Sequence, residues 1–243
     1  MCSQSRFAIL CIHGILGKPE HFAPYIPLVP PDWSICNIQL KGHCGGVKEF
    51  SRARMSEWKA QVRSSLDKLR EEHDRVIIAA HSMGTLFAIQ EAIRKPVAEL
   101  FLLNVPLRIR VTRRLFSTAW KVYRGNVDPS DVRSIAAQNA YSVEIDRNIF
   151  RYAGWIPRYL ELFGEIRKTV NIVHELLVPA HIYLSAQDEM VAPESCKFFL
   201  NNACAEVKML NSSGHYYYSP EDQSLLIEDF KRMIRETISF GSK

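Results

Sequence analysis

The segment Phe7–Ile12, with the sequence FAILCI, is apolar at every position over the length of one strand. A strand that is apolar on both sides is typical of a parallel sheet covered by helices on both faces. Five further segments have the length and composition of strands. They are Ser34–Leu40, Arg75–Ala80, Glu99–Leu103, Ala180–Ser185 and Glu206–Leu210. These segments favour a mostly parallel sheet of about six strands.

Helical patterns lie between the predicted strands. The segment 55–70 repeats large apolar residues every three or four positions, which places them on one face of a helix. Three more helices are predicted at about Thr85–Lys95, Pro193–Asn202 and Ser219–Ile238. Strands that alternate with helices predict the α/β class, with a doubly wound sheet.

The segment 105–175 breaks this alternation, because it contains helical patterns and no convincing strand. Pro157 suits the first turn of a helix, and apolar residues follow it at helical spacing. We therefore expect a core domain formed by residues 1–104 and 176–243. A helical cap subdomain, residues 105–175, is inserted into it after the strand at 99–103.

Composition excludes several classes of protein. The 243 residues are 47% hydrophobic and 23% charged, which rules out a disordered chain, a collagen and a coiled coil. The net charge is only +5, and the densest basic run, from Arg108 to Arg114, is interrupted by apolar residues. We expect no nucleic-acid partner. The basic run is either an ordinary solvated surface or a site that attracts anionic substrates or lipid headgroups.

The six cysteines predict a reducing compartment. They form no CxxC pair and no cluster with the ligand spacing of a zinc site, so we interpret Cys2, Cys11, Cys36, Cys44, Cys196 and Cys204 as reduced thiols. No apolar run approaches the length that spans a bilayer, and no cleavage site follows the first apolar run. The expectation is a cytoplasmic protein without stable membrane insertion and without a metal.

The strongest chemical signal is VIIAAHSMG at Val76–Gly84. A buried strand ends, Ser82 occupies a tight turn, and a helix follows at once. Small residues flank Ser82 at Ala80 and Gly84, as in the G-x-S-x-G turn that exposes a nucleophilic serine. Alternatively, Ser82 could serve merely as the N-cap of the helix, but the strand–turn–helix context favours a nucleophile.

A nucleophilic serine needs a base and an acid that orients the base. Asp188 follows the strand at 180–185, and His215 follows the strand at 206–210. The order Ser, acid, His is typical of doubly wound hydrolases. Glu189 and Asn104 occupy two alternative positions for the acid, but an asparagine carries no charge. The histidines His81, His174 and His181 are poorer candidates for the base.

An acyl-transfer site also needs two backbone N–H groups for the developing oxyanion. One is expected from Met83, the residue after the nucleophile. The other is expected from the loop His13–Gly17 after the first strand, where glycines allow close approach, and Ile15 is the candidate.

These segments resemble the α/β-hydrolase superfamily, near its monoacylglycerol lipases, lysophospholipases and small carboxylesterases. The similar segments are IHGILG (12–17), LKGHCGG (40–46), AAHSMGT (79–85), SAQDEMVAP (185–193) and SSGHYYY (212–218). Ala80, Thr85 and Cys44 depart from frequent glycines of the family without removing a catalytic group. Since the chain starts close to the strand that carries the oxyanion loop, we expect the first two strands of the family to be missing and about six strands to remain.

The resemblance implies hydrolysis of a carboxylic ester through an acyl-enzyme, without metal or cofactor. Ser82 attacks the ester, His215 transfers the protons, Asp188 orients His215, and Ile15 and Met83 hold the oxyanion. We expect short to medium acyl chains or monoacylglycerol-like lipids as substrates, because aromatic residues are dense in the cap. The candidate pocket residues are His13, Trp120, Tyr123, Trp155, Tyr159 and Tyr216.

Two other functions remain open at this point. A C–C bond hydrolase or lyase could use the same scaffold, since HGILG and HSMG also resemble those relatives. A binding protein with the same fold is disfavoured, because such proteins often lack one of the three catalytic residues and this sequence has all three.

Overall fold

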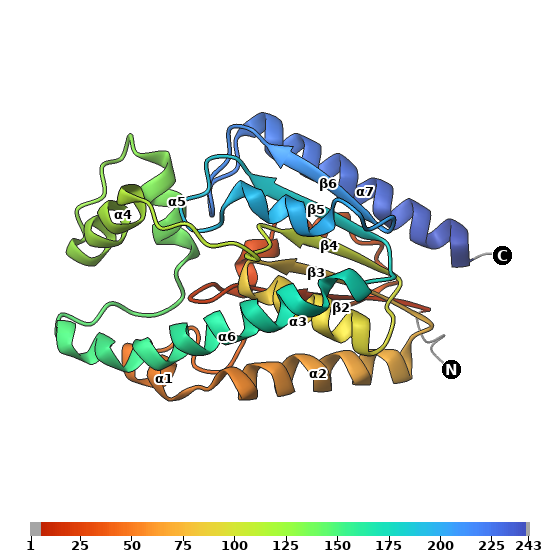
Figure 1. Ribbon diagram of the computed structural model, residues 1–243, viewed down its shortest axis with the longest axis horizontal. Coiled ribbons are helices and arrows are strands. Elements are labelled where there is room, and N and C mark those ends of the chain that lie inside the picture. The colour runs from red at the N-terminus through yellow and green to blue at the C-terminus, as the bar shows by residue number, and fades with distance from the viewer. Residues whose placement is uncertain (1–5, 242–243) are drawn as a thin grey trace.

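A computed structural model describes residues 6–241. Six strands form one sheet, in the order β2-β1-β3-β4-β5-β6, and every neighbouring pair is parallel (Figure 1). The strands are β1 (Phe7–Ile12), β2 (Ser34–Ile38), β3 (Arg75–His81), β4 (Glu99–Leu103), β5 (Ala180–Ser185) and β6 (Ala205–Leu210). The predicted six-stranded parallel sheet is confirmed. Since all strands run the same way, the loops after their carboxyl ends meet at one edge.

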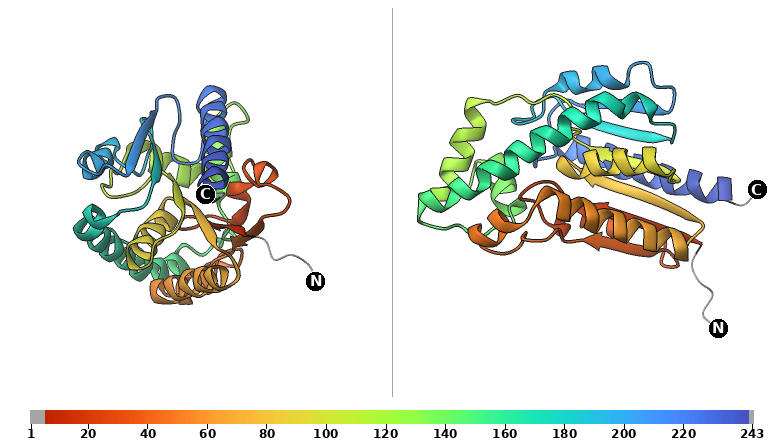
Figure 2. Two further views of the ribbon diagram at one scale, coloured as in Figure 1. Left: turned by 90° about the vertical axis from the view of Figure 1, so that its right-hand side faces the viewer. Right: turned by 60° about the horizontal axis from the view of Figure 1, so that its bottom comes forward.

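Two apolar layers enclose the sheet. One layer packs against α2 (Met55–Glu72) and α3 (Met83–Arg94), and the other packs against α7 (Pro220–Gly241). Figure 2 shows the sheet from its end, with α7 on one face and α2 and α3 on the other. Successive residues of a strand serve opposite layers: Leu10 belongs to the layer of α2, and Ile9 to the layer of α7. The doubly wound arrangement follows from strands that are apolar on both sides.

The inserted segment is helical, as its sequence pattern indicates. It contains α4 (Arg113–Arg124), α5 (Val132–Ala140), the 3₁₀ helix η3 (Ile149–Trp155), α6 (Ile156–Ile172) and the short η4 (Val173–Glu175). Helices α4 and α5 lie beyond the edge of the sheet, at the left of Figure 1. In α6, Leu162 and Ile166 join the layer of α2 and α3, and Thr169 bonds to Gln90 of α3. This helix therefore belongs partly to the core, and the cap boundaries at 105 and 175 stay predictions.

Some predicted elements differ from those in the structure. The segment expected to be a helix at 193–202 forms only a 3₁₀ helix, η5 (Pro193–Phe199). A short helix, α1 (Val47–Arg52), was not predicted, and neither were the 3₁₀ turns η1 (Pro19–Phe22) and η2 (Ile26–Leu28). Helix α3 begins two residues earlier than expected, directly after Ser82.

The five cysteines within the described part of the chain are free thiols; Cys2 lies outside that part. Among residues 6–241, the helices are too short or too polar to cross a bilayer.

Candidate active site

Ser82 occupies a strained turn between β3 and α3. Its φ angle is +49°, in the left-handed region that residues other than glycine rarely adopt. Its backbone N–H donates to the carbonyl oxygen of Leu103 in β4 at 2.9 Å. Its hydroxyl does not cap α3. A role as a helix cap therefore does not account for a serine here, whereas strain at a residue is often retained at functional sites.

Gly84 permits the sharp turn. A Cβ atom at this position would lie 2.3 Å from the carbonyl oxygen of Ile12 and 2.8 Å from that of His13. Gly14 also lies close to the turn, because its added Cβ would meet the Ser82 Cβ at 2.9 Å. The absence of side chains at Gly14 and Gly84 therefore lets the loop after β1 lie directly against Ser82.

The two amides predicted for the oxyanion hole flank this contact. Ile15 and Met83 are buried, and within residues 6–241 neither amide donates to a protein acceptor outside a helix or strand. The loop turns back through Leu16, whose φ is +58°, while Gly17 donates to the Gly14 carbonyl at 3.0 Å. This backbone can offer N–H groups beside Ser82, and the oxyanion role stays a prediction.

Asp188 and His215 contact each other in the loops after β5 and β6. His215 Nδ1 lies 2.7 Å from Asp188 Oδ2, and both side chains are buried. Asp188 Oδ1 accepts hydrogen bonds from the N–H groups of Met190 and Val191, each at 2.7 Å. The carboxylate is thus fixed by its own loop, and it fixes the imidazole ring in turn.

His215 Nε2 is buried, and no polar atom of the described residues bonds to it. The Ser82 hydroxyl is therefore not hydrogen-bonded to this nitrogen. The two loops are nevertheless neighbours, since the ring of His81 approaches the carbonyl oxygen of His215 to 3.0 Å. In sites of this kind the serine–histidine bond often shortens only when substrate binds.

The two alternative acids have other partners. Glu189 Oε2 accepts the backbone N–H of His215 at 3.0 Å and does not contact its ring. Asn104, at the end of β4, accepts the Ser185 N–H through Oδ1 at 2.9 Å. Its Nδ2 donates to the carbonyl of His215 at 3.2 Å. Both residues hold the backbone of the His215 loop, while the ring contacts Asp188.

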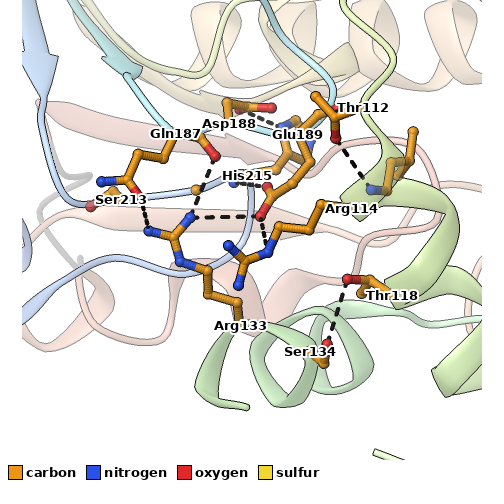
Figure 3. A network of polar contacts seen from close by, with 12 residues as sticks. Thr112, Arg114, Thr118, Arg133, Ser134, Gln187, Asp188, Glu189, Ser213 and His215 are labelled. Atoms are coloured by element: carbon orange, nitrogen blue, oxygen red, sulfur yellow. Dashed lines mark hydrogen bonds and ion pairs between the residues drawn. The ribbon is translucent and has the colours of Figure 1, made fainter.

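Basic residues of the inserted segment surround this loop. Arg114 of α4 and Arg133 of α5 approach Glu189 Oε1 to 3.7 and 3.8 Å, as Figure 3 shows. Arg110 donates to the carbonyl oxygens of Asp188 and Ala186 at 2.7 and 3.1 Å. Part of the basic run therefore anchors the loops of the site.

Other histidines crowd the same region. His21 stacks on His81, with ring centroids 3.9 Å apart, and His13 contacts His43 edge to face at 4.7 Å. Burial lowers the pKa of His21 to about 3, that of His43 to about 3 and that of His13 to about 4. Sequence reasoning assigned no role to His21 or His43, although His43 lies within the segment LKGHCGG.

His13 requires a correction. It does not line the pocket: its side chain is fully buried, with Nδ1 2.9 Å from the Gly14 carbonyl oxygen. Its Nε2 accepts the N–H of Leu40 at 3.0 Å. A neutral ring with both nitrogens engaged supports the loop after β1 and has no free atom for a substrate.

An apolar cavity of about 480 Å³ lies between the inserted segment and the loops of the site. The other predicted pocket residues, Trp120, Tyr123, Trp155, Tyr159 and Tyr216, line it. Further lining residues were not predicted. They include Ile15, Leu16, Phe116, Tyr141, Val143 and Met190. Ile15 and Tyr216 connect the cavity with the site, since Tyr216 contacts the His215 ring and Ile15 follows Gly14.

One further cluster has the composition of a metal site. Ligand atoms of Glu99, His181 and Glu236 lie within 4.8 Å of one another. Both ring nitrogens of His181 already meet carboxylates, those of Glu99 and Glu206, each at 3.2 Å. This arrangement suits a protonated imidazole better than a metal ligand. It lies near the beginning of β4 and β5, at the opposite end of the strands from Ser82.

Comparison with known proteins identifies the family of this fold. The thermostable monoacylglycerol lipase of Bacillus sp. (strain H-257) is 20% identical over 231 residues, covering 90% of this chain and 87% of that protein. A solved structure from a study of the metagenome-derived lipolytic enzymes LipS and LipT has a TM-score of 0.69 at 21% identity, covering 96% and 95% of the two chains. An ancestral haloalkane dehalogenase, AncHLD2, has a TM-score of 0.68 at 14% identity, covering 98% and 94%. The sequence profile of the Alpha/beta hydrolase family matches residues 9–224. The chain belongs to the alpha/beta hydrolase family.

Proposed function

We propose that the protein hydrolyses carboxylic esters with short to medium acyl chains, or monoacylglycerol-like lipids, with Ser82 as nucleophile. The observation that carries the proposal is the 2.7 Å contact between His215 Nδ1 and Asp188, together with a buried Nε2 to which no polar atom of residues 6–241 bonds. A base held in this way is ready to accept a proton. Lipolytic relatives support the ester as the substrate class.

The reaction proceeds in two steps. Ser82 Oγ attacks the ester carbonyl carbon while its proton passes to His215 Nε2, and Asp188 stabilises the imidazolium that forms. The N–H groups of Ile15 and Met83 bind the oxyanion. His215 then protonates the leaving alcohol. A water gives a proton to the same nitrogen and attacks the acyl carbon; the bond from this carbon to Ser82 Oγ breaks, and His215 returns the proton to Oγ as the acid leaves.

The cavity is suited to bind an apolar acyl chain. Its surface is formed almost entirely by aromatic and aliphatic side chains, and Ile15 connects it to the predicted oxyanion loop. Each methylene transferred from water into such a cavity contributes about 0.8 kcal/mol. Affinity is therefore expected to rise with chain length until the cavity is filled.

Labelling with a fluorophosphonate probe tests the nucleophile. We expect mass spectrometry to locate the probe on Ser82, and p-nitrophenyl esters from acetate to decanoate to be turned over. Replacing Ser82 by alanine should lower kcat by at least about a thousandfold. Ser195→Ala is a matched control, because Ser195 is also buried but bonds to Arg108. Unchanged turnover in Ser82→Ala would refute the proposal. Labelling without ester turnover would favour a C–C bond hydrolase or lyase.

A further inference from the structure

The net charge of the protein is concentrated in one segment. Residues 105–175 contain 12 of the 31 lysines and arginines but only seven of the 26 acidic residues. The remainder of the chain has equal numbers of both, so this segment carries the whole formal charge of +5. Its helices α4 and α5 lie at the end of the molecule opposite to the end of α7 (Figures 1 and 2).

Several of these cations have no acidic partner. Arg113 and Arg124 lie at the two ends of α4, and Arg147 lies just before η3. Within residues 6–241, none of the three forms an ion pair with a carboxylate. The guanidinium of Arg124 lies 4.9 Å from the centre of the Trp120 ring. Their positive charge is therefore available to an external anion.

Large apolar side chains are exposed among these cations. Phe116 and Trp120 line the cavity, yet 65% and 52% of their surfaces are exposed, so they form its rim. Phe150 of η3 is 85% exposed and does not line the cavity. Helix α4 and η3 are neighbours, because the rings of Tyr123 and Tyr152 contact each other. We call the exposed surface of α4 and η3 the rim face. Exposed apolar groups gathered around a cavity mouth usually indicate an interaction site.

Basic and aromatic residues on adjacent helices fit a lipid surface. Aromatic and aliphatic side chains enter the boundary between headgroups and acyl chains, while arginines remain among the headgroups. Anionic headgroups add attraction for each nearby cation. Both properties of the rim face are therefore satisfied by the same partner.

A second copy of the chain would satisfy only one of them. Contact between two rim faces would bury the apolar side chains, but it would bring together two segments that each carry +5. Like charges at contact distance repel. Charge complementarity thus selects an anionic surface over a symmetric dimer.

We propose that the rim face docks on an anionic lipid bilayer, with the mouth of the cavity turned toward the lipid. Docking goes beyond the proposed function and needs no catalytic residue. One consequence does rest on the proposed function: an apolar ester would pass from the bilayer into the cavity without crossing bulk water.

Sedimentation with vesicles tests this proposal on the full chain. We expect binding to vesicles of phosphatidylcholine mixed with phosphatidylglycerol, and much weaker binding to phosphatidylcholine alone or at high salt. Phe150→Ser should weaken binding by at least about tenfold, since it removes a ring from the acyl boundary. Arg113→Glu should weaken it by at least about fivefold. Both variants should keep wild-type turnover of a soluble short-chain ester.

Matched controls lie at the far end of the molecule. Leu177 is 82% exposed, nearly as much as Phe150, and Arg235 is an exposed arginine of α7. Leu177→Ser and Arg235→Glu should bind vesicles like the wild type. Absent binding, equal binding to neutral vesicles, or equal losses in these controls would overturn the proposal. A wild-type dimer that Phe150→Ser dissociates, seen by light scattering, would identify a second copy as the occupant instead.

The catalytic proposal is separated from docking by the Ser82→Ala variant. This variant should bind vesicles as the wild type does. Vesicle binding without ester turnover in the wild type would refute only the proposed function, and turnover without vesicle binding would refute only docking.

Discussion

Glu189 accepts the backbone N–H of His215 at 3.0 Å, while Arg114 and Arg133 approach the same carboxylate from α4 and α5 (Figure 3). One side chain thus joins the loop of the proposed base to two helices of the inserted segment. The neighbouring Asp188 contacts the imidazole ring. Asp188 therefore positions the ring of His215, and Glu189 positions its backbone.

Removing the Glu189 carboxyl group should disturb both connections. In Glu189→Ala the His215 N–H loses its acceptor, which costs about 1–3 kcal/mol in unfolding free energy, and kcat should fall by about tenfold. Glu189→Gln keeps an acceptor oxygen and should retain most of both. Urea unfolding and ester kinetics measure the difference. Glu194→Ala, an exposed glutamate nearby in sequence, is the control. Equal behaviour of the alanine and glutamine variants would contradict the role of the hydrogen bond.

The buried histidines predict loss of stability in mild acid. Burial, together with the charge of His13, lowers the pKa of His43 to about 3 in the folded protein. The unfolded chain binds the proton near pH 6.5, so unfolding takes up protons as the pH falls below that value. Each such histidine then lowers the unfolding free energy by about 1.4 kcal/mol per pH unit. His43→Phe should reduce the slope of unfolding free energy against pH by about one proton between pH 6 and 4. Identical slopes for variant and wild type would contradict this assignment.

Two glycine substitutions should have opposite effects. A methyl group at Gly84 meets the backbone oxygens of Ile12 and His13, which cannot move without displacing β1 and the following loop. Gly84→Ala should therefore lower the unfolding free energy by about 1–3 kcal/mol and reduce activity strongly. Gly164 in α6 has open space around an added Cβ, and Gly164→Ala should raise the unfolding free energy by about 0.5–1 kcal/mol. Thermal unfolding of both variants checks the pair.

The cavity should set the preferred acyl chain. Ala119 of α4 lines it, and a phenyl ring at this position would occupy space that several methylenes need. In Ala119→Phe, kcat/KM for the decanoate ester should fall by at least about tenfold, while that for the acetate ester stays within about threefold. Ala60→Phe, on the exposed side of α2, controls for the added ring. A uniform loss across the ester series would place the acyl chain elsewhere.

Strand positions were readily predicted because the strands are buried on both faces. The segments Phe7–Ile12, Glu99–Leu103 and Ala180–Ser185 have the same bounds in the sequence prediction and in the structure. Helix α1 was missed because six residues with two buried side chains, Val47 and Phe50, form no recognisable period. Pro193–Phe199 has apolar spacing that suits either helix type, so periodicity did not separate a 3₁₀ from an α-helix.

The site was predictable where a residue follows a strand. Ser82, Asp188 and His215 each come directly or shortly after one, and the parallel sheet brings those ends together. The sequence did not show that His13 supports Leu40, because that contact joins residues 27 positions apart. In α4, by contrast, the apolar residues recur at helical spacing on one side of the helix, and this side lines the cavity.

The uneven placement of charge described above also makes the protein an electric dipole. Residues 105–175, which include the helices beyond the carboxyl ends of the strands, hold the entire excess of +5, and the rest of the chain is balanced. Near a negatively charged object, such a dipole turns before contact, so encounters are oriented before short-range forces act. The bias extends over roughly one Debye length, about 8 Å at physiological salt. Added salt should therefore lower the association rate at an anionic surface by a larger factor than it raises the dissociation rate. This is a kinetic effect that a measurement of affinity alone does not reveal.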